Sequence, residues 1–117
     1  MDILIVEDDR VLSLMLMRMV ERMGHSVKDS VTTGEEAVEI SQNGGVDLIL
    51  MDIMLEGHID GIEAMKQIRN NNDVPVIYVT GNSDKTTIER AKSTNYIDYL
   101  VKPIVFDQLR ESIKRVS

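Results

Sequence analysis

The stretch Asp47-Leu48-Ile49-Leu50-Met51-Asp52 decides the fold of this 117-residue chain. It is a short, continuous apolar run that ends on a carboxylate. An apolar run without alternation predicts a strand that is buried on both faces, as in a parallel sheet covered by helices on each side. Such sheets bind ligands at the carboxyl ends of their strands. Asp52 is expected at such an end, which makes it the first candidate functional residue.

Strand-like and helix-like segments alternate strictly along the rest of the chain. The other predicted strands are residues 3–6, 26–31, 76–79 and 97–101. Helices are predicted over residues 10–23, from 33 to the stop at 43–45, over 60–70, from 82 or 83 to about 95, and after Pro103. Five such units predict right-handed crossovers and helices on both faces. We therefore expect an α/β fold of the flavodoxin-like, doubly wound type, with three layers and strand order 2-1-3-4-5, in a single domain over residues 1–117.

Several local features of the helices are also predicted. The buried stripe of the first helix is expected to be Leu12, Met15, Leu16, Met19 and Met23. The expected N-caps are Asp9, Thr33 (with Glu36 in a capping box), Asp60 (with Glu63 at the third helical position), and Asn82 or Ser83. The fourth helix has only Ile88 and Ala91 as convincing core contacts. The last helix is expected to bury Phe106, Leu109 and Ile113.

Composition excludes several classes of function. The net charge of −7 argues against nucleic-acid binding by this chain, because phosphate contacts need a basic surface. The absence of cysteine removes disulfides, thiolate metal sites and cysteine nucleophiles. No apolar run approaches the roughly 20 residues of a membrane-spanning helix, and the first residues lack the basic start and cleavage site of a signal peptide. We expect a cytoplasmic protein without a membrane association.

Polar side chains gather where the predicted strands end: Glu7, Asp8, Asp52, Thr80 and Lys102. The predicted order makes the first and third strands neighbours, so their carboxylates converge. Like charges at ~4 Å repel by about 4 kcal/mol at an effective dielectric near 20, so such a cluster calls for a cation. Oxygen ligands without His or Cys select Mg²⁺ or Mn²⁺. Together with a lysine and a hydroxyl, the cluster predicts phosphoryl transfer to Asp52.

Other phosphate-handling classes do not match the residues. Phosphatases of the haloacid dehalogenase type need Asp-x-Asp after the first strand, but Arg10 stands two positions beyond Asp8. A flavin site in this fold needs a hydroxyl- and glycine-rich loop where this chain has acids. An NTPase would need a glycine-rich loop ending in Gly-Lys-Ser/Thr, which is absent.

The chain resembles the receiver domain of two-component response regulators along its whole length. Four motifs carry the resemblance, each at an expected strand end: Ile5-Val6-Glu7-Asp8-Asp9, Leu50-Met51-Asp52-Ile53-Met54, Val79-Thr80-Gly81 and Tyr99-Leu100-Val101-Lys102-Pro103. The resemblance implies a phosphorylation-dependent switch. A sensor histidine kinase or a histidine phosphotransfer protein would donate the phosphoryl group, and the chain would catalyse only its own phosphorylation and dephosphorylation.

The resemblance also implies a role for each matched residue. Asp52 would be the phosphoacceptor. Mg²⁺ would be held directly by Asp8, Asp52 and the Met54 carbonyl, with Glu7 acting through water. Lys102 would pair with the phosphoryl group, and Thr80 would move to hydrogen-bond it. The resemblance further implies that Tyr99 is a switch residue and that the Lys102–Pro103 peptide bond is cis. Met54 and Asn82 would tune the rate of phosphate loss.

Two departures from the family pattern stand out. The loop after the phosphoacceptor reads Leu55-Glu56-Gly57-His58-Ile59-Asp60-Gly61, without the usual proline and with one residue added. Ile104 stands where a phenylalanine commonly follows Lys-Pro, and Phe106 is the candidate to fill that volume. Met54 cannot orient an attacking water well, so slow autodephosphorylation is expected.

Partner surfaces are predicted as well. Leu14 and Met17 are expected to face solvent, either as scattered exposed residues or as a docking site for the kinase. The output is expected on the face formed by the fourth helix, fifth strand and fifth helix, where an unknown downstream protein or a second, phosphorylated copy would bind. The chain ends after its last predicted helix, as in a stand-alone receiver or a fragment of a larger regulator. The alternative is a pseudo-receiver that binds proteins and never takes phosphate.

Overall fold

Five parallel strands form one sheet in the order β2-β1-β3-β4-β5 in the computed structural model, which describes residues 1–116. The strands are β1 (Asp2–Val6), β2 (Ser26–Val31), β3 (Leu48–Met51), β4 (Val76–Thr80) and β5 (Asp98–Val101). The helices are α1 (Arg10–Arg22), α2 (Gly34–Gln42), α3 (Gly61–Arg69), α4 (Lys85–Lys92) and α5 (Phe106–Lys114). All four strand pairs are parallel. The predicted flavodoxin-like fold and its strand order are confirmed.

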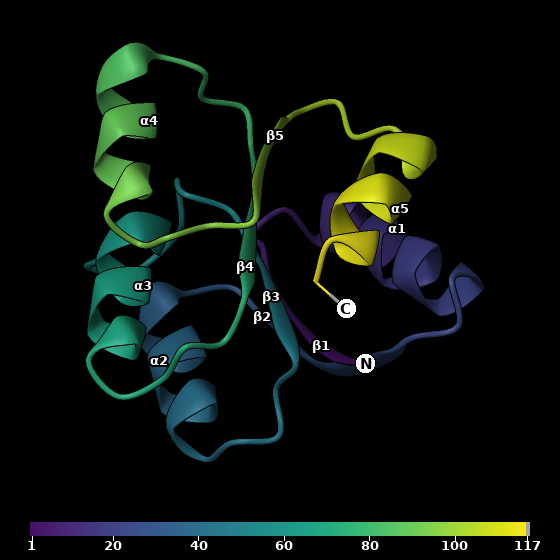
Figure 1. The fold of residues 1–117 in the computed structure, drawn as a ribbon, viewed down its shortest axis with the longest axis horizontal. Helices are drawn as coiled ribbons and strands as arrows, with labels where there is room; N and C mark the ends of the chain where they lie inside the picture. The colour runs from purple at the N-terminus through teal and green to yellow at the C-terminus, as the bar shows by residue number, and fades with distance from the viewer. Residues whose placement is uncertain (117) are drawn as a thin grey trace.

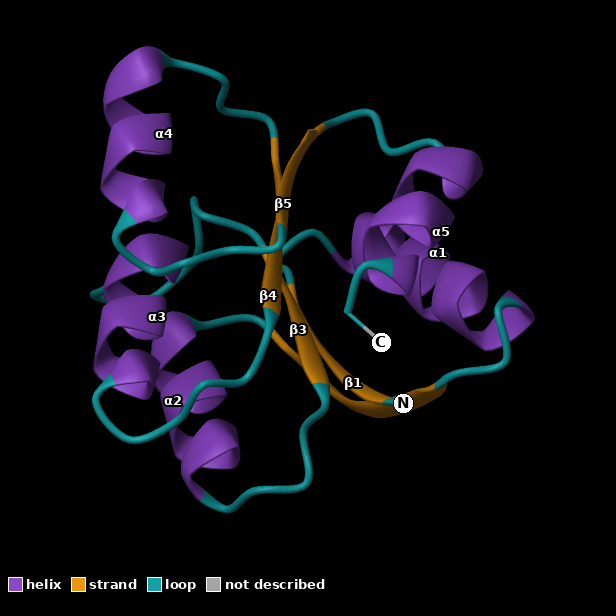
Figure 2. Ribbon diagram, viewed as in Figure 1, coloured by secondary structure: helices purple, strands orange, loops and turns teal. Residues whose placement is uncertain are grey.

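The helices cover both faces of the sheet. Figure 1 shows α1 and α5 together on one face, with α2, α3 and α4 on the other. Figure 2 shows the strands nearly edge-on between these two helical layers. The chain alternates strand and helix throughout, so each connection between parallel strands passes through a helix. This is the expected three-layer arrangement.

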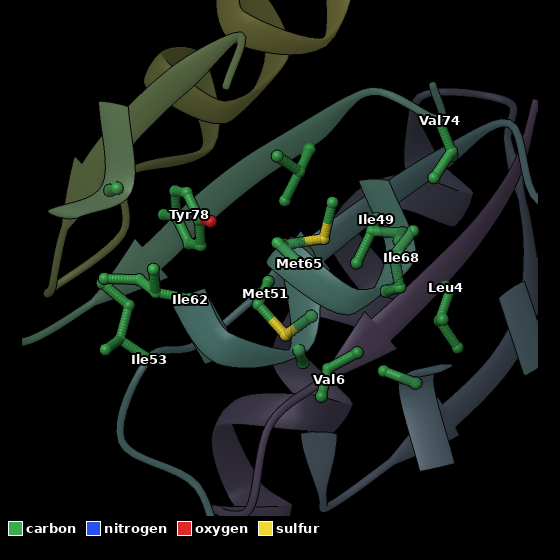
Figure 3. Close-up of a cluster of buried hydrophobic side chains, with 14 of the residues drawn as sticks. Leu4, Val6, Ile49, Met51, Ile53, Ile62, Met65, Ile68, Val74 and Tyr78 are labelled. Atoms are coloured by element: carbon green, nitrogen blue, oxygen red, sulfur yellow. The ribbon is translucent and has the colours of Figure 1, made fainter. Parts of the chain in front are cut away.

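A hydrophobic cluster lies on each face of the sheet. Alternate residues of the two central strands divide between them: Leu4, Val6, Ile49 and Met51 enter the cluster under α2 and α3, whereas Ile3, Ile5, Leu48 and Leu50 enter the cluster under α1 and α5. Figure 3 shows the first cluster, in which Met65 of α3 and Tyr78 of β4 meet the strand side chains. Because both sets of side chains are buried, these strands have continuous apolar sequences rather than alternating ones.

The first helix departs from the expected buried stripe. Met15 is 47% exposed, and Val20, which the predicted stripe omits, lies in the core. Because α1 is apolar around most of its circumference, residue spacing alone selects no single stripe. Met17, expected to face solvent, packs against the core cluster of α1 and α5, whereas Leu14 is 48% exposed as expected.

Two predicted helix caps form as expected, and one forms in part. Asp9 accepts hydrogen bonds from the first-turn amides of α1. Asp60 and Glu63 make a complete capping box at α3. At α2 the Thr33 hydroxyl accepts from the Glu36 N–H, but the Glu36 carboxylate bonds the Thr33 hydroxyl and not the Thr33 amide. The capping box of α2 is therefore incomplete.

The prediction for the start and length of α4 is wrong. Asp84 caps this helix by accepting from the Thr87 N–H at 2.8 Å, in place of Asn82 or Ser83. Asn82 instead accepts from the Asp84 N–H, one step earlier in the turn. Asn82, Ser83 and Asp84 are all residues that favour the N-cap position, so the sequence alone does not determine which of them begins the helix. The helix spans only Lys85–Lys92; of its two predicted core contacts, Ala91 is buried and Ile88 is only partly buried, whereas Thr87 is buried instead.

Phe106 does not enter the core. Its ring is partly buried and lies beneath the guanidinium groups of Arg22 and Arg110. Ile104 fills the interior position itself and is buried in the cluster of α1 and α5. Phe106 is the first residue of α5, at the edge of that cluster, so matching helical spacing with Leu109 does not bury it.

Candidate functional site

Three carboxylates meet at the carboxyl ends of β1 and β3. The two strands pair in parallel, with Val6 opposite Met51, so the residues that follow them are neighbours. The Asp52 N–H donates to the Val6 carbonyl at 2.9 Å, which extends this pairing by one residue. One carboxylate oxygen from each of Glu7, Asp8 and Asp52 lies within 4.8 Å of the others. The predicted convergence is confirmed in geometry.

Lys102 reaches this cluster from the end of β5. Its backbone N–H donates to the Thr80 carbonyl at 2.8 Å, which fixes the residue beside β4. Its ammonium nitrogen lies 2.8 Å from Asp52 Oδ2 and 2.9 Å from Glu7 Oε1. The peptide bond between Lys102 and Pro103 is cis, as expected. One ammonium group therefore bridges two of the three carboxylates.

Asp52 is held at both of its oxygens. Oδ1 accepts from the N–H of Ile53 at 2.7 Å, while Oδ2 accepts from Lys102. The residue is only 4% exposed. Asp8 is more accessible, and its carboxylate makes no hydrogen bond with any residue in the range 1–116. The reactive candidate is thus fixed, and one neighbouring acid keeps its oxygens available.

The cluster is electrostatically unbalanced. Burial raises the pKa of the Glu7 carboxyl to about 7, although the Asp9 N–H and Lys102 both favour its ionised form. Burial would lower the pKa of Lys102, but its contacts with Asp52 and Glu7 outweigh that effect and raise the pKa above its ordinary value. One lysine leaves the three carboxylates with an excess of negative charge, which a divalent cation would offset.

The donor set fits a hard divalent cation. All three candidate ligands offer carboxylate oxygens. The contact between Lys102 and Glu7 Oε1 lacks hydrogen-bond geometry, so this buried oxygen has no hydrogen-bond partner in the described part of the chain. Oxygen donors, excess negative charge and a buried carboxylate oxygen that accepts no hydrogen bond are together suited to Mg²⁺ or Mn²⁺.

The two predicted switch residues meet at Asn82. The Thr80 hydroxyl is buried and accepts from the Asn82 N–H at 3.3 Å. Tyr99 donates its hydroxyl hydrogen to the Asn82 carbonyl at 2.6 Å. The Tyr99 ring packs within 6 Å of the rings of Tyr78 and Tyr96, centroid to centroid, at 5.9 Å in each case. This three-ring cluster escaped the sequence analysis, because strand and loop tyrosines at positions 78, 96 and 99 carry no shared spacing.

Most of the predicted site residues line a single cleft of about 760 Å³. The cleft contains Glu7, Asp8, Asp52, Met54, Thr80, Asn82 and Lys102. Tyr99 stands outside it, behind Asn82. Leu14 and Met17 line an adjoining hollow that shares Glu7 with the cleft. The structure therefore gathers the residues predicted for phosphoryl transfer in one cleft and places the predicted switch residue Tyr99 outside that cleft.

The altered loop beyond Asp52 has a defined path. Gly57 adopts φ +92°, a left-handed conformation that favours glycine. The N–H of His58 donates to Glu35 Oε2 at 3.0 Å, and Glu56 forms a β-bridge with Thr33. The added residue is thus accommodated by contacts with the start of α2. The hydrogen bond from His58 also lowers the pKa of the exposed Glu35 carboxyl.

Comparison with known sequences decides the family. Residues 3–114 match the family model of the response regulator receiver domain. The chain belongs to this family. Curated relatives of this receiver domain include the transcriptional regulatory protein PdtaR of Mycobacterium tuberculosis, 30% identical over 96% of this chain and 54% of PdtaR. ResD of Bacillus subtilis is 32% identical over 98% of this chain and 46% of ResD. The chain spans about half the length of these relatives.

Solved structures agree with the family. The signal receiver domain of a modulated diguanylate cyclase from Desulfovibrio desulfuricans matches with a TM-score of 0.91 and 36% identity, covering 98% of this receiver domain and 91% of that chain. The receiver domain of a sensor histidine kinase from Pseudomonas aeruginosa matches with a TM-score of 0.86 and 31% identity, covering 98% and 96%. That second structure has a magnesium ion coordinated in its active site cleft.

Membrane-spanning structure is not found. Across residues 1–116, none of the helices of this receiver domain combines the length and the apolar composition needed to cross a bilayer.

Gly61 is a residue that the sequence analysis left without a role. A Cβ at this position would collide with the carbonyl oxygen of Asp52 and lie 2.9 Å from Met51 Cγ. The Gly61 N–H also donates to the Ile53 carbonyl at 2.8 Å. The start of α3 therefore packs directly on the backbone that carries Asp52. A glycine beside an N-cap in a buried turn is the signal that could have identified it.

We predict that Gly61→Ala lowers the free energy of unfolding by about 3 kcal/mol, because backbone must move to accommodate the methyl group. Urea unfolding followed by circular dichroism measures the loss. Gly81→Ala is the matched control, since nothing lies within 4 Å of a Cβ there. Equal stability of the two variants would contradict the close approach at Gly61.

Proposed function

We propose that residues 1–117 form one receiver module that is phosphorylated on Asp52 in a two-component pathway. The donor would be the phosphohistidine of a sensor histidine kinase or of a histidine phosphotransfer protein. The observation that carries the proposal is the 2.8 Å contact of Lys102 with Asp52 inside a cluster of three carboxylates. Family membership supports it, because the chain has the acids, the lysine and the hydroxyl that this chemistry would use.

In the proposed reaction, a carboxylate oxygen of Asp52 attacks the phosphorus atom. The bond between phosphorus and the donor nitrogen breaks, and its electron pair leaves with the imidazole ring. Lys102 is already within contact distance of Asp52 and would neutralise an oxygen of the transferred group. The Thr80 hydroxyl would donate a hydrogen bond to another oxygen. The chain would act on itself alone and not on a separate substrate.

Glu7, Asp8, Asp52 and the backbone carbonyl of Met54 would hold Mg²⁺, with Mn²⁺ as a substitute. The bound cation would offset the negative charge that accumulates between the carboxylates and the phosphoryl oxygens. Asp8 has free carboxylate oxygens in the cleft, which suits a direct ligand. Glu7 is more deeply buried and already contacts Lys102, which suits an indirect role.

In the proposed switch, a conformational change at Thr80 reaches Tyr99 through Asn82. A shift of the Thr80 hydroxyl toward a phosphoryl group would break its hydrogen bond with the Asn82 N–H. Tyr99 holds the carbonyl of the same residue, so it would respond to that movement. The face formed by α4, β5 and α5 would then change, and a downstream protein or a second copy of the chain would recognise it.

We expect one phosphoryl group per chain when the protein is incubated with acetyl phosphate and Mg²⁺, as measured by intact mass spectrometry. Asp52→Asn should remove the gain, because the amide is a far weaker nucleophile than the carboxylate. Chelation of divalent cations should also remove it. Asp47→Asn is the matched control, since Asp47 precedes the opposite end of β3.

A wild-type chain that gains no mass would contradict the proposed phosphorylation and favour a pseudo-receiver that only binds proteins. A mass gain that persists in Asp52→Asn would exclude Asp52 as the acceptor.

Three exposed apolar residues of α1 form the proposed donor-docking patch, and one of them, Leu14, lines the hollow that adjoins the cleft. Val11 is 72% exposed and Leu14 is 48% exposed, and Met15 takes the place that the sequence analysis assigned to Met17. Leu14 lines the hollow beside Glu7. A helix of the phosphodonor protein would cover this patch while its phosphohistidine enters the cleft.

We predict that Leu14→Asp slows phosphotransfer by at least about tenfold from a histidine kinase that phosphorylates the wild-type chain, because a charge then occupies an apolar contact. Phosphorylation by acetyl phosphate should stay within about twofold, since no docking helix is involved. Val105→Asp, an exposed apolar position in the loop before α5, serves as the control. Equal slowing with both donors would show that Leu14 affects the chemistry and not docking.

Met54 is proposed to lengthen the life of the phosphorylated state, together with Asn82. Its side chain is 66% exposed at the rim of the cleft, and a thioether orients water poorly. Met54→Asn should therefore speed phosphate loss by about fivefold or more, as timed by intact mass. Met54→Leu, which keeps an apolar side chain, should leave the rate unchanged. An unchanged or slower loss in Met54→Asn would disprove this role.

A further inference from the structure

A second hollow lies on the face of the sheet covered by α1 and α5, which run beside each other in Figure 1. Its volume is about 500 Å³, within the range of about 300 to 1,000 Å³ typical of sites for small molecules. It shares no lining residue with the carboxylate cleft. Its lining includes Arg22, Met23, Phe106, Arg110, Ile113 and Lys114.

The charge of this α1–α5 hollow is opposite to that of the chain as a whole. The chain carries a net charge of −7, yet no Asp or Glu is found among the described residues that line the hollow. Arg22, Arg110 and Lys114 supply its cations, of which Arg110 pairs with Asp107 and Lys114 with Glu111. Burial lowers the pKa of His25, which also borders the hollow, so we count it as neutral. A basic hollow on an acidic protein indicates complementarity to an anion.

Arg22 is positioned to bind an oxyanion. Its guanidinium carbon lies 4.4 Å from the centroid of the Phe106 ring, so the ring supports the flat face of the group. Arg22 forms no ion pair with a carboxylate in the described part of the chain. Stacking occupies the face of a guanidinium and leaves the N–H donors at its edge available for two parallel hydrogen bonds.

Arg110 can bind the same anion as Arg22 with little loss of free energy from its existing ion pair. Its guanidinium carbon lies 5.8 Å from the same ring centroid. Its ion pair with Asp107 is long, at 3.2 Å, and both side chains are largely exposed. Exposed pairs of this kind contribute about 0 to 1 kcal/mol, so an incoming anion can displace the carboxylate.

The walls of the hollow are apolar. Ile113 belongs to the buried cluster under α1 and α5, and Met23 packs against that cluster. Phe106 lies at the edge of the hollow, with both guanidinium groups over its ring. Such walls favour a ligand with an apolar or planar body over a fully hydrated inorganic anion.

We propose that the α1–α5 hollow is a binding site for a small organic anion. Its phosphate, sulfonate or carboxylate head would contact Arg22 and Arg110, and its apolar or planar body would lie against Met23, Phe106 and Ile113. The α1–α5 hollow and the carboxylate cleft have no lining residue in common, so anion binding does not require phosphorylation at Asp52.

The test uses 8-anilinonaphthalene-1-sulfonate, a planar apolar anion that fluoresces when it leaves water. Its fluorescence should saturate at one molecule per chain, with half-saturation below about 1 mM. Amide NMR signals of residues 22–25 and 106–114 should shift first. Arg22→Gln should weaken binding at least about fivefold, because it removes the charged fork. Asp52→Asn should bind as the wild type does, which separates this site from the proposed function.

Arg18→Gln is the matched control, since Arg18 is an exposed arginine on the same helix that does not line the hollow. It should change binding by less than about twofold. Arg22→Lys keeps the charge and loses the fork, so it should fall between wild type and Arg22→Gln. Circular dichroism establishes that all variants are folded.

Competition defines the preferred ligand. Displacement of the probe by adenosine monophosphate identifies a planar phosphate, and displacement by octanoate identifies a flexible carboxylate. Inorganic phosphate should compete at least about tenfold less well than the better of these two. Equal competition by inorganic phosphate would overturn the role of the apolar walls. Binding that Arg22→Gln leaves unchanged, or NMR shifts centred elsewhere, would overturn the site.

Discussion

Carboxylates crowded at the ends of β1 and β3 are the constraint on which the rest of this structure depends. Parallel pairing places Glu7 and Asp8 beside Asp52, where like charges at ~4 Å repel by about 4 kcal/mol at an effective dielectric near 20. Within the described chain the offsetting charge is Lys102, which comes from β5, on the far side of β4. The sheet order matters for this reason: only with β4 between β3 and β5 does the Thr80 carbonyl hold the Lys102 backbone in place.

Apolar packing keeps these charges where they are. Each central strand buries side chains on both faces, so neither strand can slide without moving a complete set of core residues. Gly61 adds a constraint at the strand end, because it brings the start of α3 against the Asp52 backbone. The site is thus fixed by the core beneath it, while its ligand atoms stay at the rim of an open cleft.

Features that depend on sequence period or on strand ends were predictable, and those that depend on competition between equivalent residues were not. The alternation of five strands and five helices predicted the strand order and, through it, the meeting of Glu7, Asp8, Asp52 and Lys102 at the strand ends. Met15 and Met17 were misplaced because both faces of α1 are apolar. Asp84 caps α4 by accepting from the Thr87 N–H, whereas Asn82 accepts from the Asp84 N–H in the turn before the helix. Phe106 has the spacing of a core residue, but it lies at the edge of the core, where its ring contacts the guanidinium groups of two arginines.

The contacts of α4 are unevenly distributed along its length. Its C-terminal end is pinned: Thr94 bonds Tyr78 and the Ala91 carbonyl, Arg69 holds the Thr94 carbonyl, and Arg90 pairs with Asp60 at 2.8 Å. Its N-terminal end is held by local hydrogen bonds with the turn that contains Asn82 and by the buried side chain of Thr87. The hydrogen bonds and the ion pair that tie α4 to α3 and β4 therefore gather at the end of the helix farther from Thr80.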